Sequence, residues 1–293
     1  MAGFTLFEMV IVIALTGIIA SSLVVFFTPA VKAYFDARRR AELSDSADTT
    51  LRRMARDIRM AVPNSIRSPN TQCFELLPTM TGGRYRMAPD TAADKVAACP
   101  ETPDMANANC SAPLDTTEPS RGFDVLSPLS ATPAANDLVV IGNQDANEVY
   151  AGRTVATISG VSAPNAALGT RRISVGAHQF PAGYDGGRFS IVPGNGGAPA
   201  VFYVCANAAG VDAQGNGTGT LYRVSRALVP SYPAACPSVD GAAVLATHVR
   251  SCSFVYSPDT GTTQRGFVSM HIEMTRENET VSLSSGAHVD NVP

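Results

Sequence analysis

The chain has 293 residues, of which 45% are hydrophobic and 16% are charged, a size that supports one large domain or two small ones. Its formal net charge of −3 gives no general basic surface, so we expect no nucleic acid among its partners. The charge is uneven along the chain. Residues 4–67 contain nine Lys and Arg against six Asp and Glu, whereas residues 68–293 contain 13 against 19.

The first feature in chain order is an apolar run, since residues 9–28 contain no charged side chain. At about 1.5 Å per helical residue this run reaches roughly 30 Å, the thickness of a bilayer's hydrocarbon core. The pattern therefore predicts a transmembrane helix over 9–28. A cleavable secretory signal would have a basic start, a shorter apolar region and a small-residue cleavage site after it, so we expect the run to remain in the mature chain.

The helix is expected to continue beyond the membrane. Apolar residues recur at helical spacing with charged residues on the opposite side, and they are Ala47, Leu51, Met54, Ala55, Ile58 and Val62. Pro63 is expected to end the pattern, and Pro29 is the expected kink. A helix over 4–62 would be about 88 Å long. Its apolar first half would lie in a membrane or filament core, and its amphipathic second half would pack on a globular head.

The rest of the chain predicts short strands separated by turns. The expected strands cover residues 73–77, 123–126, 137–141, 148–158, 171–175, 188–192, 200–205, 221–225, 252–256, 266–275 and 280–284. Residues 64–70 are expected to form a turn. Residues 251–257 and 266–275 are expected to form a hairpin, and residues 87–120 to form a long surface loop. Closely spaced strands indicate antiparallel pairing. The predicted fold class is therefore α+β, with a long N-terminal helix packed on an antiparallel β-sheet head.

The six cysteines are Cys73, Cys99, Cys110, Cys205, Cys236 and Cys252. No C-x-x-C motif is present, so neither a zinc ribbon nor a redox motif is expected. Six cysteines allow fifteen pairings. We expect disulfides, with Cys99 and Cys110 as a local pair. Of the three C-terminal cysteines, two are expected to pair with each other and one with Cys73.

No catalytic residue is expected and the chain is not predicted to be an enzyme, because it contains neither a G-x-S-x-G nor an H-E-x-x-H motif. His271 and Glu273 have a spacing that metals can use on one strand face, but no third ligand accompanies them. Residues 212–217 resemble the start of a calcium loop. Gln214 is a poor ligand there, and Arg223 stands where the bidentate Glu should be. We expect no metal and no cofactor, with calcium as the weaker alternative.

The residues in front of the apolar run, GFTLFE from Gly3 to Glu8, resemble the G-F-T-L-x-E signature of type IV prepilins and pseudopilins. The resemblance implies that a prepilin peptidase in the inner membrane cuts after Gly3 and methylates the new amino group of Phe4. In that family the carboxylate at the position of Glu8 pairs with the N-terminal amine of a neighbouring subunit. Phe4 and Glu8 would then be the residues of subunit assembly.

A second stretch, residues 50–67, is similar to the stalk of MshO-type minor pilins of the mannose-sensitive haemagglutinin pilus, as is the ending 288–293. This resemblance implies a minor pilin that helps to initiate or cap a pilus. Its partners would be other minor and major pilins through the N-terminal helix, the prepilin peptidase and inner-membrane lipid. Two alternatives are a minor pseudopilin at the tip of a type II secretion system and a membrane-anchored periplasmic enzyme.

The expected organisation is a leader over 1–3, the pilin helix over 4–62 and the head over 63–293. The leader has no Lys or Arg, unlike most prepilin leaders, whereas Lys32 and residues 38–40 are basic. By the positive-inside rule alone the head would be cytoplasmic. The cysteines favour an oxidising compartment, and a basic leader encoded upstream of the printed start would fit the family. We expect a single-pass protein of the bacterial inner membrane with a periplasmic head, which then enters a pilus at the cell surface.

Overall fold

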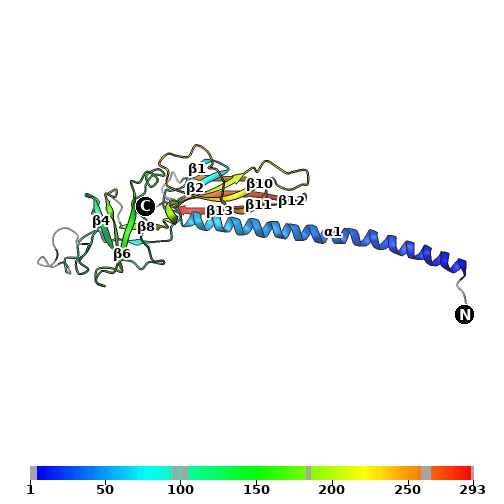
Figure 1. The fold of residues 1–293 in the computed structure, drawn as a ribbon, viewed down its shortest axis with the longest axis horizontal. Helices are drawn as coiled ribbons and strands as arrows, with labels where there is room; N and C mark the ends of the chain where they lie inside the picture. Colours follow the sequence, from blue (N-terminus) through cyan, green and yellow to red (C-terminus); the bar gives the residue numbers. More distant parts are fainter. Residues whose placement is uncertain are drawn as a thin grey trace.

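The computed structural model describes residues 5–92, 94, 99, 105–182, 186–258 and 265–291. One long helix, α1 (Leu6–Arg59), is followed by antiparallel strands, so the predicted α+β class is confirmed. Figure 1 shows α1 projecting far beyond the strands at its N-terminal end, while its C-terminal part lies along them. The expected head of one antiparallel sheet is not what forms, because the strands divide between a seven-stranded and a six-stranded sheet.

α1 is one continuous helix of 54 residues. It runs through Pro29, the expected kink, with a gentle curve and no break (Figure 1). The helix ends at Arg59, and the N–H of Met60 still donates to the carbonyl of Arg56 at 3.1 Å. This end comes before the predicted residue 62, because the N–H of Val62 donates instead to the carbonyl of Leu77 at 2.8 Å.

The larger sheet has the order β1-β2-β9-β10-β11-β12-β13, and all its neighbours are antiparallel. Its strands are β1 (Arg67–Asn70), β2 (Cys73–Leu76), β9 (Ala200–Ala206), β10 (Gly219–Arg226), β11 (Ala243–Ser257), β12 (Arg265–Arg276) and β13 (Glu279–Asp290). The predicted hairpin is confirmed as β11 with β12, although its turn over 259–264 lies outside the described residues. A two-residue turn joins β12 to β13, and both its residues, Glu277 and Asn278, have positive φ, as tight hairpins require.

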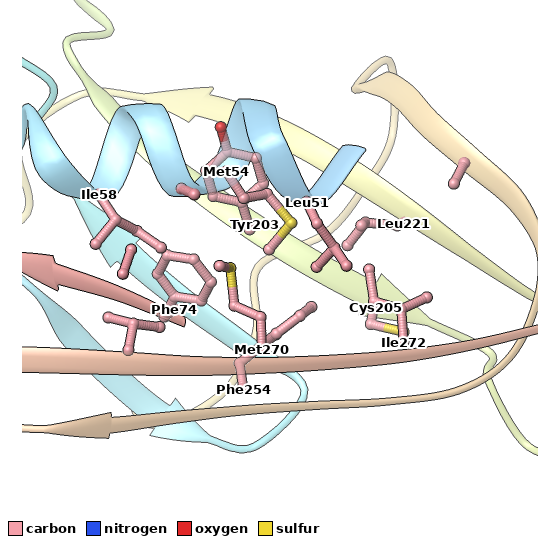
Figure 2. Packing of buried hydrophobic residues seen from close by; sticks show 14 of the residues in the cluster. Leu51, Met54, Ile58, Phe74, Tyr203, Cys205, Leu221, Phe254, Met270 and Ile272 are labelled. Atoms are coloured by element: carbon pink, nitrogen blue, oxygen red, sulfur yellow. The ribbon is translucent and has the colours of Figure 1, made fainter. Parts of the chain in front are cut away.

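The main hydrophobic core lies between this sheet and the second half of α1. The buried residues of α1 are Leu43, Ala47, Thr50, Leu51, Met54, Ala55 and Ile58. Figure 2 shows Met54 and Ile58 pointing from the helix towards Phe74 and Met270 of the sheet. The spacing of three and four residues puts these side chains on one face of the helix. This apolar face packs against the seven-stranded sheet of the same chain.

The smaller sheet has the order β3-β8-β5-β6-β7-β4. Its strands are β3 (Thr81–Arg84), β4 (Ser120–Val125), β5 (Leu138–Val140), β6 (Val155–Ser162), β7 (Arg171–His178) and β8 (Arg188–Val192). It has a core of its own, in which the rings of Phe123 and Phe189 lie 5.2 Å apart between centroids. The head is thus built around two main cores.

A junction with a third apolar cluster connects the two sheets, and Val62, Leu77, Val140 and Tyr150 are among its members. Beside it lies a fully buried ion pair between Arg67 and Glu75, with Nε to Oε2 at 2.9 Å. The guanidinium group of Arg67 also stacks 3.4 Å above the ring of Tyr150. Arg226 binds the other oxygen of Glu75 at 2.9 Å, so loss of Glu75 would leave the buried cation of Arg67 without its counter-charge.

Most predicted strands lie within observed ones, and the range 188–192 coincides with β8. Three expectations are wrong. β1 occupies part of the segment that the sequence predicts as a turn, and β3 falls where no strand is expected. Residues 148–153 form a turn rather than the start of a strand. In that turn Val149 and Tyr150 are buried at the junction, so their apolar character serves packing and not a strand face.

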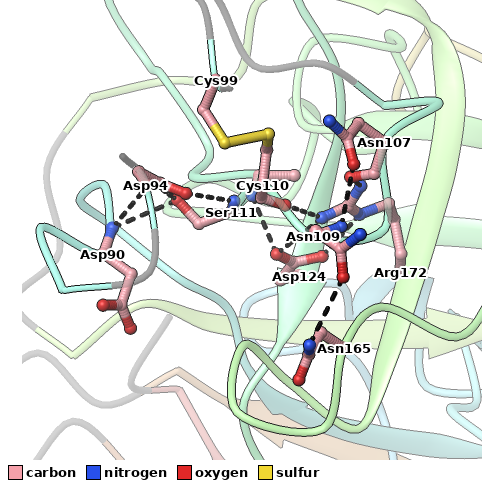
Figure 3. Close-up of a disulfide and its surroundings, with 11 residues drawn as sticks. Asp90, Asp94, Cys99, Asn107, Asn109, Cys110, Ser111, Asp124, Asn165 and Arg172 are labelled. Carbon is pink, nitrogen blue, oxygen red and sulfur yellow. Dashed lines mark hydrogen bonds and ion pairs between the residues drawn. A yellow bond between two sulfur atoms is a disulfide. The ribbon is translucent and has the colours of Figure 1, made fainter. Parts of the chain in front are cut away.

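The six cysteines form three disulfides, Cys73–Cys236, Cys99–Cys110 and Cys205–Cys252, in agreement with the expected arrangement. Figure 3 shows the surroundings of Cys99–Cys110 in the predicted long loop. Buried Arg172 binds the carboxylate of Asp124 at 2.7 Å and also donates to the carbonyl of Asn107 at 2.8 Å. A disulfide and a buried cation therefore hold the described part of this loop against β4 and β7.

Candidate functional site: the apolar half of the N-terminal helix

The first half of α1 is uncovered. Of 26 exposed large hydrophobic side chains in the described residues, 18 lie between Leu6 and Phe35. Leu6 is 84% exposed and Phe26 is 78% exposed, so every side of the helix is open. Among the described residues this is the one helix that is long and apolar enough to cross a membrane, judged by length and composition. Contiguous exposed apolar surface of this extent indicates contact with a membrane or with other proteins.

The serine and threonine hydroxyl groups of residues 9–28 are hydrogen-bonded within the helix. Ser21 donates to the carbonyl of Ile18 at 2.9 Å, and Ser22 donates to that of Ile19 at 2.8 Å. Thr28 donates in the same way to the carbonyl of Val24 at 2.7 Å. A hydroxyl that is satisfied by its own helix can enter an apolar environment without leaving an unpaired donor. These polar residues are therefore compatible with burial in lipid or between helices.

Glu8 closes the first turn of the helix. Its Oε2 accepts hydrogen bonds from the N–H of Thr5 at 2.9 Å and from the Thr5 hydroxyl at 3.0 Å. The Thr5 hydroxyl oxygen in turn accepts from the N–H of Glu8 at 3.3 Å, which completes a capping box. A carboxylate in this position also interacts favourably with the positive end of the helix dipole. Sequence reasoning missed this role, although the Thr-x-x-Glu spacing before the apolar run is its signature.

The other predicted assembly residues cannot be compared with the structure, because Gly3 and Phe4 lie outside the described residues. The Oε1 atom of Glu8 has no partner among the residues that the structure describes, and the residue is exposed. The capping box thus uses one carboxylate oxygen and leaves the other open. Among the described residues, no other charged group pairs with the Glu8 carboxylate.

Ion pairs mark the place where α1 meets the head. Arg39 pairs with Glu277 at 2.5 Å and with Asp36 of its own helix at 2.7 Å. One residue further, Arg40 pairs with Glu279 at 2.5 Å. Glu277 lies in the β12–β13 turn and Glu279 begins β13, so this hairpin contacts α1 at the boundary between its two halves.

The weaker sequence candidates have structural partners. His271 Nδ1 lies 2.9 Å from the hydroxyl of Ser284, and Glu273 accepts from the hydroxyl of Ser251 at 3.0 Å. Asp212, the first residue of the calcium-like segment, accepts from the N–H groups of Gln214 and Asn216 at 2.9 and 2.8 Å. These hydrogen bonds lower the pKa of the Asp212 carboxyl, that from Asn216 most strongly. The described residues contain no group of three or more His, Cys, Asp or Glu side chains that could hold a metal ion.

Comparisons with protein-family models, curated proteins and solved structures find no match to this chain. The function is therefore inferred from the residues of the chain and their geometry. An uncovered apolar helix half, a capped start with a carboxylate and a docked second half together form a segment suited to insertion and helix–helix assembly.

Proposed function

We propose that the chain is a minor type IV pilin, similar to MshO-type subunits, that takes part in initiating a pilus or in its tip complex. A prepilin peptidase would cut the bond between Gly3 and Phe4 and methylate the amino group of Phe4. The protein would be held in the bacterial inner membrane by the first half of α1 with its head in the periplasm. Extraction from the bilayer would then bring this half against the helices of other pilins.

The observation that carries this proposal is the continuity of α1 across two environments. The first half exposes apolar side chains on all sides, and the second half of the same helix is packed into the head. A rigid helix of this form can transfer its bare half from lipid to a helical bundle without refolding the head. Both environments are apolar, so the transfer exchanges one set of van der Waals contacts for another.

Glu8 gives the proposed assembly a specific contact. Its oxygen Oε1, which takes no part in the capping box, is available to the N-terminal amine of a neighbouring subunit. In an apolar bundle each of these charges alone would be costly, and pairing offsets part of that cost for both. The pair would therefore favour the helix register in which carboxylate and amine meet. Size supports a minor role, because a head of two sheets is bulky for a subunit repeated at every step of a filament.

The test is the N-terminal mass of the protein from bacteria with and without prepilin peptidase. We expect a chain that begins at N-methylated Phe4 only when the peptidase is present. Gly3→Leu should abolish this processing, because it replaces the glycine after which the signature places the cut. Gly17→Ala is the matched control, since a Cβ at Gly17 meets no atom within 4 Å and the residue lies outside the signature. A chain that begins at Met1 in both strains would contradict the proposal.

Deletion of the protein separates the pilin from the pseudopilin alternative. We expect loss of surface pili with normal secretion of exported enzymes. Loss of exported enzymes with intact pili would instead assign the chain to a type II secretion system.

A further inference from the structure

A cleft of about 520 Å³ opens to solvent at the end of α1, between the two sheets. One wall is the turn after the helix, including Met60 and Pro63, and the other is the edge formed by β3 and β8. Nothing in the proposed pilin function uses this cleft. Its volume lies within the range of about 300–1,000 Å³ that is typical of small-molecule sites.

Three arginines line the cleft, and they come from three different elements. Arg59 is the last residue of α1, Arg84 ends β3 and Arg188 begins β8. Arg84 and Arg188 are direct partners in the antiparallel register, so their side chains leave the sheet on the same face. Gly82 and Ser190, the partners two residues along, lie on this face as well. Arg84 and Arg188 therefore extend from neighbouring positions on one face of the sheet, at one end of the cleft.

These arginines have no counter-charge within the described chain. The guanidinium groups of Arg59, Arg84 and Arg188 form no ion pair and no hydrogen bond with any residue that the structure describes, and all three residues are exposed. Asp290 is the one carboxylate among the described lining residues, and in the register it lies opposite Arg265. Like charges directly opposite one another in a sheet are destabilising. A bound anion would offset this repulsion.

The remaining lining is suited to a sugar. Ser127 and Ser190 bring hydroxyl groups to the same wall as Arg84 and Arg188. The Ser127 oxygen accepts from the N–H of Arg84 at 2.9 Å, which leaves its own proton free to donate. Met60 is 42% exposed and provides apolar surface on the opposite wall. In a complex with a sugar acid, the arginines would pair with the carboxylate and the serine hydroxyls would hydrogen-bond to the sugar hydroxyls. Met60 would contact the face of the sugar ring.

Two other anions fit the site less well. An inorganic phosphate or sulfate would fill only a small part of 520 Å³. A headgroup of the membrane that holds α1 would be out of reach. Arg59 lies 31 residues beyond the end of the apolar run, which corresponds to roughly 46 Å along the helix.

We propose that this cleft binds an acidic sugar, with the carboxylate between Arg84 and Arg188 and the ring towards Met60. The inference is independent of the pilin proposal, because it rests on the head alone. The ligand is a hexuronic acid, either as the free sugar or as a residue of an acidic polysaccharide. Binding requires the guanidinium pair, and a neutral hexose of the same shape lacks the group that this pair recognises.

The test is isothermal titration of the full chain in detergent micelles with D-glucuronate, D-glucose and sodium sulfate at fixed ionic strength. Glucuronate and glucose differ only in the carboxylate, so we expect binding of glucuronate and none of glucose. Arg84→Gln and Arg188→Gln should each weaken glucuronate binding at least about tenfold, because each removes a charge-assisted contact. The matched control is Arg121→Gln, an exposed strand arginine at the opposite edge of the same sheet, which should leave the affinity unchanged.

Stability measurements separate loss of binding from loss of fold. Without ligand, Arg84→Gln should unfold at the same temperature as the wild type or higher, because the substitution removes a like-charge contact. A glucuronate oligomer tests the polymeric source, and tighter binding of the oligomer than of free glucuronate would identify a polysaccharide as the ligand. Absence of glucuronate binding, equal affinity for sulfate, or unchanged affinity in both arginine variants would overturn the proposal.

Discussion

The two halves of α1 belong to one helix but have opposite surroundings. In the first half large side chains such as Phe7 and Ile18 are 72% and 65% exposed. In the second half Met54 and Ile58 are fully buried against the seven-stranded sheet. The first half is apolar on all sides, whereas the second has one apolar face and one charged face. The number of apolar faces, and not apolar content alone, distinguishes a helix that needs an external partner from one that its own chain covers.

The largest effect on stability is expected from truncating a buried side chain in the second half of α1, which the seven-stranded sheet covers. Met54→Ala removes a side chain with no exposed surface and should lower the free energy of unfolding by about 2–5 kcal/mol. Met9→Ala is the matched change in the bare half, where the side chain is 59% exposed, and it should change stability by less than about 0.5 kcal/mol. Denaturant unfolding followed by circular dichroism, with the disulfides intact, measures both. Equal losses would show that the halves do not differ.

A charged substitution in the first half of α1 should affect membrane insertion, whereas the substitution in the second half affects folding stability. Ile18→Arg places a cation near the centre of the apolar run and should disfavour membrane insertion by about 2.5–3.5 kcal/mol. The expected result is a protein that is released from bacterial membranes by alkaline carbonate, while Ile18→Leu remains bound. Retention of the Ile18→Arg protein in the membrane fraction would contradict a bilayer location for this half.

A smaller effect is expected where the covered half makes a polar contact. The hydroxyl of Tyr203 donates to Asp57 of α1 at 2.6 Å, so Tyr203→Phe should lower the free energy of unfolding by about 1.5–3 kcal/mol. Burial, together with the charge of Asp57, raises the pKa of Tyr203. The folded state therefore keeps the tyrosine proton more firmly than the unfolded state does. Stability from this group should be present below its ordinary pKa of about 10 and fall as the pH rises further.

Unfolding midpoints between pH 8 and 11 measure this effect. The wild type should lose stability more steeply above pH 10 than Tyr203→Phe. Parallel curves for the two proteins would show that the buried hydroxyl does not contribute to the alkaline loss.

The smallest effect is expected at the boundary between the halves. Arg39→Gln removes the pairs with Glu277 and Asp36 and should cost at most about 1 kcal/mol, because both partners retain contact with water. The loss should shrink in 1 M salt, where exposed charges are screened. Arg53→Gln, an exposed position on α1 with no ion pair among the described residues, is the control. A salt-independent loss for Arg39→Gln would indicate a packing role.

The helix could be predicted from the sequence because its signals are local. The uncharged run, the apolar spacing and Pro63 beyond the end lie within one segment, and the structure has α1 from Leu6 to Arg59. The division of the head into two sheets could not be predicted, because short spacing indicates antiparallel pairing without telling which strands share a sheet. β2 and β3 are neighbours in sequence but belong to different sheets.

The candidate sites show the same limit. The signature of residues 3–8 marks Glu8, but its capping partner Thr5 follows only from reading the spacing as a helix start. Arg67 stands in a segment that reads as a turn, yet it is fully buried with Glu75. Arg84 and Arg188 are 104 positions apart in the printed numbering and meet only through the pairing of β3 with β8. Contacts of this kind depend on strand register, for which a single sequence has no local signal.

The most direct test of the account is removal of residues 1–35. The remaining chain keeps Asp36, Arg39 and the whole covered half of α1. We predict that it is soluble without detergent, forms its three disulfides and unfolds within about 2 °C of the full chain, since none of the described residues from 5 to 35 belongs to the buried core. Aggregation, or a midpoint that is lower by about 10 °C or more, would contradict the claim that the first half serves only external partners.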